Sequence, residues 1–82
     1  MIITICEEDI SQSASGIIDN PVARALGRAT GARWKVWDGR VAQEMHAPHR
    51  VVALPRQVHS AWDEGAEANQ FQPFSFDLEF AD

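Results

Sequence analysis

The sequence predicts a single small α+β domain with the element order β-α-β-β-β-α-β. Three observations predict it: two segments with apolar residues at helical spacing each open at a proline, an Asp-Gly link joins two strand-like runs, and the chain closes with apolar–polar alternation. We expect a mostly antiparallel sheet with two helices packed on one face, because each helix must bury its apolar stripe. A chain of 82 residues supports one modest core, so residues 1–82 are predicted to form one domain.

The chain begins with a predicted strand over residues 1–6, which are rich in β-branched side chains. Residues 7–15 are polar and short-sided, which fits either a loop or a single helical turn. A catalytic cysteine needs an electropositive setting, whereas Cys6 precedes Glu7, Glu8 and Asp9. We therefore expect Cys6 to be a small core residue or an inert thiol, and a lone cysteine fits a reducing compartment.

The first helix is predicted to begin at Asp19-Asn20-Pro21, where a capping side chain precedes a proline. Gly31 supplies its end. The apolar stripe that recurs at i, i+3, i+4 and i+7 consists of Val22, Ala25, Leu26 and Ala29. Arg24 and Arg28 then lie on the opposite, solvent-facing side of this helix.

The Asp38-Gly39 link is typical of a two-residue type I′ hairpin. Pairing across such a link sets Trp37 opposite Arg40, Val36 opposite Val41, and Trp34 opposite Gln43. One face of the hairpin then carries Trp34, Val36 and Val41. The opposite face carries Arg33, Lys35, Trp37, Arg40, Ala42 and Glu44.

The remaining elements are a strand over residues 50–54, a helix from Pro55 to about Gly65, a polar loop over residues 67–72, and a closing strand over residues 73–80. The helix places Val58, Ala61 and Trp62 at helical spacing. The closing strand directs Phe74, Phe76, Leu78 and Phe80 inward and Ser75, Asp77 and Glu79 outward. The predicted core combines those inward residues with Leu26, Trp34, Val36 and Trp62.

Charge is segregated along the chain. Residues 1–23 carry four acids and no base, residues 24–56 carry seven bases and two acids, and residues 57–82 carry six acids and no base. The net charges are therefore −4, +5 and −6, which sum to −5. Such segregation predicts a patched surface that can orient a charged partner. The negative total disfavours general binding to nucleic acid, which depends on Lys and Arg.

No catalytic constellation stands out. His46, His49 and His59 suggest a metal at first sight, but the first two flank a proline and no cysteine or carboxylate set completes a zinc site. The carboxylate pairs in residues 63–67 and 77–79 fall at a helix end and on a solvent-facing strand side, so we expect them to be solvated. We therefore predict no enzyme, no metal and no cofactor.

Two surfaces remain as candidate binding sites. The first is an acidic face that would imitate a row of phosphates and occupy a basic channel on another protein; its residues are Glu7, Glu8, Asp63, Glu64, Glu67, Asp77 and Glu79. The alternative is the basic and aromatic hairpin, which would bind single-stranded nucleic acid through charge and stacking; its residues are Arg33, Lys35, Trp37 and Arg40.

Three motifs resemble a family of small phage and prophage proteins: Pro-Val-Ala-Arg-Ala-Leu over residues 21–26, Leu54-Pro55 before the second helix, and Pro-Phe-Ser-Phe-Asp-Leu over residues 73–78. Asn20 stands where many members have a cysteine. The resemblance implies a mobile-element origin. It favours a non-enzymatic inhibitor of host machinery, most plausibly an anti-CRISPR protein that blocks access of a CRISPR effector to DNA.

The segment at the N-terminus lacks the basic and apolar regions of a signal peptide, and the apolar runs are too short to span a bilayer. We therefore expect a cytoplasmic protein of the host cell that has a host protein complex as its partner and does not bind a membrane.

Overall fold

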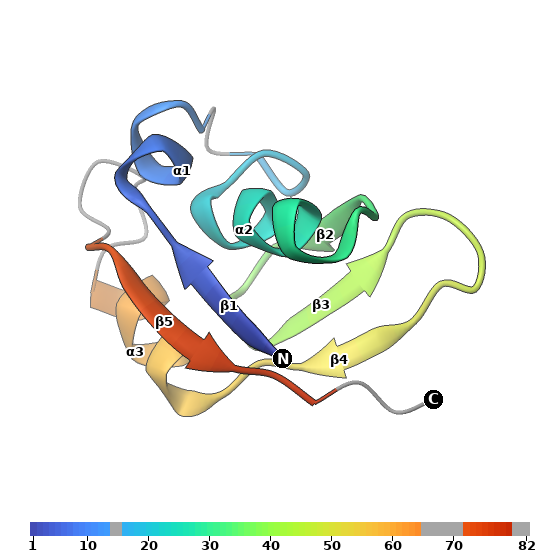
Figure 1. The fold of residues 1–82 in the computed structure, drawn as a ribbon. Coiled ribbons are helices and arrows are strands. Elements are labelled where there is room, and N and C mark those ends of the chain that lie inside the picture. Colours follow the sequence, from blue (N-terminus) through green and yellow to red (C-terminus); the bar gives the residue numbers. More distant parts are fainter. Residues whose placement is uncertain (14–15, 65–71, 80–82) are drawn as a thin grey trace.

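Five strands and three helices form within residues 1–13, 16–64 and 72–79, the part of the chain that the computed structural model describes (Figure 1). In chain order they are β1 (Ile2–Ile5), α1 (Glu7–Ser11), α2 (Pro21–Thr30), β2 (Trp34–Val36), β3 (Val41–Glu44), β4 (Val51–Ala53), α3 (Arg56–Glu64) and β5 (Phe74–Asp77). The α+β class is confirmed, as is the order of the strands and the two longer helices. Residues 7–11 take the helical alternative.

The strands divide between two antiparallel sheets, where the sequence suggested one. β1 pairs with β5, so the first and last strands lie side by side, while β2, β3 and β4 form a separate sheet in that order (Figure 1). Strand patterns in a sequence specify which side chains are buried, but they do not specify which strand each one pairs with.

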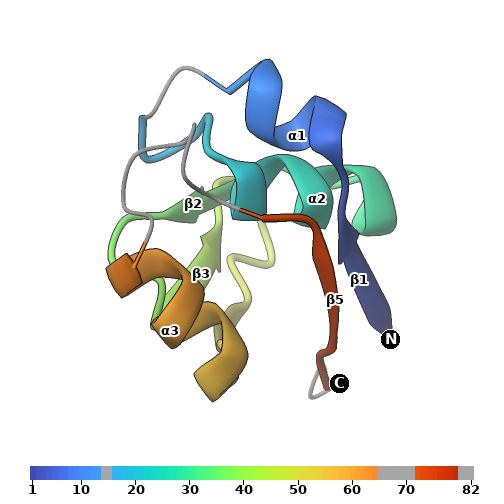
Figure 2. The ribbon, with the colours of Figure 1, turned by 90° about the vertical axis from the view of Figure 1, so that its left-hand side faces the viewer.

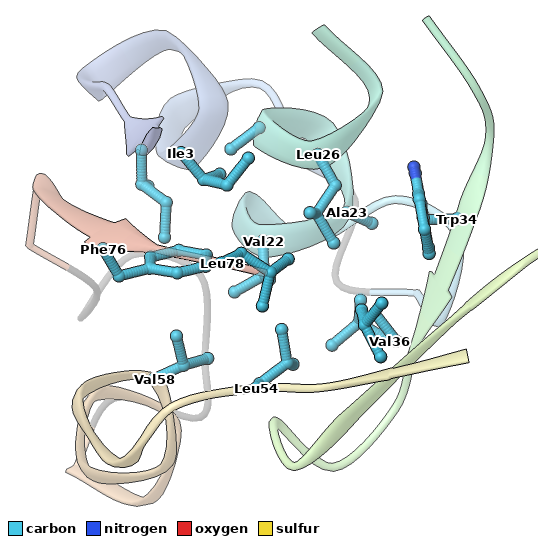
Figure 3. Packing of buried hydrophobic residues seen from close by; sticks show 14 residues of the cluster. Ile3, Val22, Ala23, Leu26, Trp34, Val36, Leu54, Val58, Phe76 and Leu78 are labelled. Atoms are coloured by element: carbon cyan, nitrogen blue, oxygen red, sulfur yellow. The ribbon is translucent and has the colours of Figure 1, made fainter. Parts of the chain in front are cut away.

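A single apolar cluster fills the space between these sheets and helices. Figure 3 shows side chains of α2, β2, β5 and α3 converging on it from different sides. Its members are Ile3, Ile5, Val22, Ala23, Ala25, Leu26, Trp34, Val36, Ala42, Val52, Leu54, Val58, Phe76 and Leu78. Phe74 and Trp62, which the sequence placed in the core, are only partly buried against it. Phe80 lies outside the described residues.

The helix α2 begins and ends as its sequence predicts. The Asn20 side chain accepts a hydrogen bond from the Ala23 N–H at 2.9 Å, and Gly31 closes the helix with φ +76°. Ala29 is exposed, so the predicted stripe is wrong at its last position. The stripe ends one turn early because the core lies under the first two turns, where Val22, Ala25 and Leu26 are buried.

Cys6 lies at the start of α1, just after β1, and is partly exposed, so the expectation that it is a core residue is wrong. Its N–H donates to the Asp9 carboxylate at 2.9 Å, an interaction that fixes the first turn of the helix. α1 lies next to α2 (Figure 2). This contact places the first acids of the chain close to the basic residues of α2.

The hairpin register differs from the prediction by one residue. Trp34 pairs with Glu44, Lys35 with Gln43 and Val36 with Ala42, so the connection is longer than the two-residue link expected. Because side chains alternate along a strand, the slip exchanges the two faces of β3. Ala42 and Glu44 are buried, and Val41 is only partly covered.

Contacts between the hairpin tip and α3 explain the longer connection. A Cβ on Gly39 would lie 2.6 Å from Cβ and Cγ of Trp62, so the tip backbone packs directly on that ring. The Arg40 guanidinium donates two hydrogen bonds to the Asp63 carboxylate, at 2.9 and 2.8 Å. A type I′ turn needs positive φ at both central residues, and here Gly39 has it while Asp38 does not.

The closing strand β5 keeps its predicted alternation. Phe76 and Leu78 are buried, while Ser75, Asp77 and Glu79 are exposed. The predicted loop over residues 67–72 lies outside the described residues, apart from Gln72.

None of the helices among the described residues has the length and apolar character needed to cross a membrane.

Candidate functional site

Four acids of the predicted acidic face lie near β5, two beside its start and two at and beyond its end. Glu7 and Glu8 line an open groove together with Phe74 and Ser75 at the start of this strand. Asp77 and Glu79 are exposed farther along the same chain segment. We call this set, Glu7, Glu8, Asp77 and Glu79, the acidic ribbon surface. Within the described residues its one ion pair joins Asp77 to the amino group of Met1 at 3.0 Å.

Asp63 does not join the acidic ribbon surface as a free acid. Its bidentate pair with Arg40 lowers its pKa, chiefly through the hydrogen bonds from the guanidinium. The side chain of Glu64 and the whole of Glu67 lie outside what the structure describes. The predicted acidic face is therefore divided. The Asp63–Arg40 pair joins a residue of this acidic face to a residue of the basic hairpin face, the two surfaces that the sequence offered as alternatives.

The basic hairpin face is reduced by the same pair. Strand alternation places Arg33 and Lys35 on the side of β2 opposite to the buried Trp34. Trp37 follows them and is 48% exposed. Arg40 is held by Asp63 and points to α3 instead. Three of the four predicted members, Arg33, Lys35 and Trp37, remain together.

Ion pairs cancel much of the charge segregation seen along the chain. Arg24 pairs with Asp19, Arg28 with Asp9, Arg40 with Asp63, and Arg50 with Glu44. Three of these pairs join a base of the central segment to an acid of the N-terminal or C-terminal segment. The segregation therefore encodes contacts between distant parts of the chain, and the surface keeps a smaller asymmetry than the sequence suggested.

The pair between Asp9 and Arg28 is the most buried on the acid side. Arg28 donates to both carboxylate oxygens of Asp9, whose side chain is 3% exposed. The Arg28 guanidinium also donates to the Thr4 carbonyl at 2.6 Å. Burial by itself raises the pKa of Asp9. Hydrogen bonds from Arg28 and from the backbone and thiol of Cys6 outweigh it and leave the pKa lowered.

Glu44 and Arg50 form a second cluster beside Trp34. Both side-chain oxygens of the buried Glu44 accept from the Arg50 guanidinium, and Oε1 also accepts from the Arg50 N–H at 3.0 Å. These hydrogen bonds from Arg50 are the main cause of the lowered pKa of Glu44. The guanidinium carbon lies 5.7 Å from the centroid of the Trp34 ring, within the range of a cation–π contact. These hydrogen bonds link the last residue of β3 to the residue just before β4, the two ends of the connection between these strands.

The histidines do not converge. His46 and His49 are exposed in the connection between β3 and β4, whereas His59 is partly buried in α3. Within residues 1–13, 16–64 and 72–79, no three His, Cys, Asp or Glu side chains are grouped so as to hold a metal ion.

Two features escaped the sequence reasoning. The Asn20 Nδ2 donates to the carbonyls of Gly16, Ile17 and Val36, so a residue recognised as a helix cap also joins α2 to β2. Ile17 and Ile18 are 52% and 46% exposed. The residues next to Asn20 in the sequence gave no signal that its side chain also bonds β2. The exposed isoleucines could have been noticed as an Ile17-Ile18 pair just before a predicted helix start.

No protein-family model, curated protein or solved structure matches this chain.

Proposed function

We propose that this protein is a non-enzymatic inhibitor from a phage or other mobile element that acts in the host cytoplasm by binding a host protein complex. The complex we favour is a CRISPR effector, whose DNA-binding groove the acidic ribbon surface would occupy. The observation that supports this proposal is the position of Glu7, Glu8, Asp77 and Glu79 around one strand, at the surface of a protein with net charge −5.

Strand geometry gives the acidic ribbon surface a regular spacing. Asp77 and Glu79 are two residues apart on an extended segment, so their side chains leave the same face about 6–7 Å apart. Glu7 and Glu8 extend the row at the start of β5, beside Phe74. The backbone that carries these carboxylates is already folded, so meeting the lysines and arginines of a nucleic-acid groove requires ordering of the side chains but not of the backbone.

The test is capture of a CRISPR effector complex by the tagged protein, followed by measurement of DNA binding by the captured complex. We expect capture with loss of DNA binding, and a weaker effect as salt concentration rises, because exposed charges are screened. A variant with Glu7→Lys, Glu8→Lys and Glu79→Lys should lose inhibition.

The matched control is the variant with Asp63→Lys, Glu64→Lys and Glu67→Lys, which changes net charge by the same amount. We expect it to keep more inhibition than the first variant, because Asp63 is engaged by Arg40 in the wild-type protein. If only the control loses inhibition, the acidic ribbon surface is not the site. If the wild-type protein captures no effector, the proposed partner is wrong.

The second candidate function is binding of single-stranded nucleic acid by Arg33, Lys35 and Trp37. The exposed Trp37, which directly follows β2, supports it together with Arg33 and Lys35, the bases on either side of the buried Trp34. Affinity for short single strands that is lost on Trp37→Ala and kept on Arg40→Ala would favour this function over inhibition by the acidic ribbon surface.

A further inference from the structure

The β1–β5 ribbon has one edge whose outward backbone groups form no hydrogen bond with any described residue. Leu78 N–H donates to the Met1 carbonyl at 2.8 Å, and the Met1 amino group donates to the Leu78 carbonyl at 3.0 Å. Residues 1 and 78 are therefore a hydrogen-bonded pair. In an antiparallel ladder such pairs alternate with pairs whose backbone groups point away from the partner.

This alternation decides which backbone groups face outward. With the register Ile2 to Asp77 and Thr4 to Ser75, both of these pairs are of the non-hydrogen-bonded kind. Two contacts agree with this assignment: the Thr4 and Ser75 hydroxyls meet at 2.9 Å, and the Thr4 carbonyl accepts from Arg28 on the outer side of β1. The N–H and C=O groups of Ser75 and Asp77 therefore point to the other edge, where no described residue bonds them.

A groove runs beside this edge, between β5 and α3. It is lined by Arg56, Gln57, Ser60, Ala61, Phe74 and Ser75. Arg56 is exposed and forms no ion pair with any described residue. The edge therefore has a base near its first half and two acids, Asp77 and Glu79, in its second half.

We propose that a second copy of this chain pairs with this edge, β5 against β5 and antiparallel, around a two-fold axis at Phe76. A two-fold interface brings the same patch of both copies together. The antiparallel arrangement sets the acidic half of one strand beside the half of the other that lies next to Arg56. The base beside the first half of β5 in one copy thus meets the acids in the second half of β5 in the other copy.

The positions of the outward backbone groups select one register. With Phe76 on the axis, Ser75 of each copy lies opposite Asp77 of the other, and two hydrogen-bonded pairs form. With Ser75 on the axis, Asp77 faces Pro73, which has no N–H to donate. With Asp77 on the axis, two carboxylates face each other, which is unfavourable. The first register alone pairs every outward group of Ser75 and Asp77 without opposing like charges.

The assembly closes at two copies. Arg28 occupies the outer side of β1 at the Thr4 carbonyl, so the far edge of the ribbon does not offer the same open ladder. Pairing of β5 would give a four-stranded sheet, β1-β5-β5-β1, with Asp77 and Glu79 of both copies on one side.

Sedimentation equilibrium of the full chain tests this inference in the absence of any partner, so the result is independent of the proposed function. We expect the mass to rise with concentration from 9.1 kDa towards twice that value. Ser75→Pro should stay at the monomer mass, because proline removes an outward N–H that is not used within the ribbon. Ser75→Ala is the matched control and should still dimerise; circular dichroism checks that both variants fold.

Two further measurements locate the interface. Amide hydrogen exchange at Ser75 and Asp77 should slow as the protein concentration rises. Arg56→Glu should weaken the dimer, and Glu79→Lys added to it should restore association. A monomer mass across concentrations of about 10 µM to 1 mM, which covers weak and transient interfaces, overturns the inference. A dimer whose Ser75 and Asp77 amides exchange at an unchanged rate overturns the β5 interface.

Discussion

Single residues at the junctions of this fold perform more than one task. Asn20 shows this most clearly: its oxygen caps α2, and its nitrogen donates to three carbonyls, the best of them that of Val36 at 2.8 Å. The asparagine amide suits this position because its oxygen accepts while its NH2 group supplies two N–H donors on a separate atom. Since Asn20 is 4% exposed, water does not replace these bonds when they are lost.

Replacing Asn20 by aspartate tests this double role. Aspartate is as good a helix cap as asparagine, so a cap alone predicts no change. We expect Asn20→Asp to lower the free energy of unfolding by about 2–3 kcal/mol, because a carboxylate then faces three carbonyl oxygens in a buried site. Urea denaturation measures it. Asn20→Ser keeps a capping oxygen but replaces the two amide N–H donors with one shorter hydroxyl and adds no charge, so it should fall between the two. Equal stability of Asn20→Asp and wild type would contradict the network.

Among the elements, the β2–β3 hairpin shows how a helix elsewhere in the chain alters a local turn. Gly31 and Gly39 both have φ +76°, but a Cβ at Gly31 would meet no atom within 4 Å, whereas one at Gly39 would overlap Trp62. Backbone strain is therefore common to both sites, and the steric overlap is specific to the hairpin tip.

This difference gives a controlled experiment on the contact between the hairpin and α3. Gly31→Ala should cost about 1 kcal/mol, from the left-handed backbone conformation alone. Gly39→Ala should cost about 2–3 kcal/mol, because the Trp62 ring or the tip must also move. Thermal unfolding of both variants measures the difference, and roughly equal shifts in Tm would mean that the tip does not pack on Trp62 in solution.

Across the whole molecule, the charges that are segregated in sequence meet as ion pairs in the fold. Asp9, Glu44 and Asp63 all have a pKa below its ordinary value. A carboxyl whose folded pKa is depressed stabilises the fold above its unfolded pKa, and this stabilisation is lost as the pH falls through the folded value. Stability should therefore be constant with respect to these groups near neutral pH and decline below about pH 4.

A comparison of the Asp9–Arg28 and Asp63–Arg40 pairs shows which of them contributes more to the dependence of stability on pH. Asp9 and Asp63 each accept two hydrogen bonds from an arginine, but Asp9 is 3% exposed and Asp63 is 58% exposed. At pH 7, Asp9→Asn should cost about 1–2 kcal/mol, a range reduced because Arg28 is half exposed. Asp63→Asn should change stability little, because water screens an exposed pair.

The same comparison at low pH completes the test. The deficit of Asp9→Asn relative to wild type, measured by urea unfolding, should shrink between pH 5 and pH 3, because wild type then loses the same interaction. A deficit that stays constant over this range would mean that the Asp9 carboxylate is not selectively stabilised in the folded protein.

The sequence alone predicted the strands and the two longer helices, whereas it left α1 open between a loop and a helical turn. Asn20, Pro21 and Gly31 mark the limits of α2 through local hydrogen bonding and backbone preference, and the Phe76–Leu78 alternation identifies β5 and its buried side. These signals are local, because each depends on neighbours within a turn or on one side of a strand. The same reasoning found the acids and the exposed aromatic residue from which both candidate surfaces are built.

Only the tertiary structure decided how these elements combine. It paired β1 with β5, moved the hairpin register by one residue through contacts with α3, and joined Asp63 to Arg40. Each of these outcomes depends on residues far apart in the chain, between which a sequence pattern carries no distance information. The division of acids between internal ion pairs and the acidic ribbon surface follows from the same long-range contacts, because a carboxylate is free for a partner only where the fold brings no arginine to it.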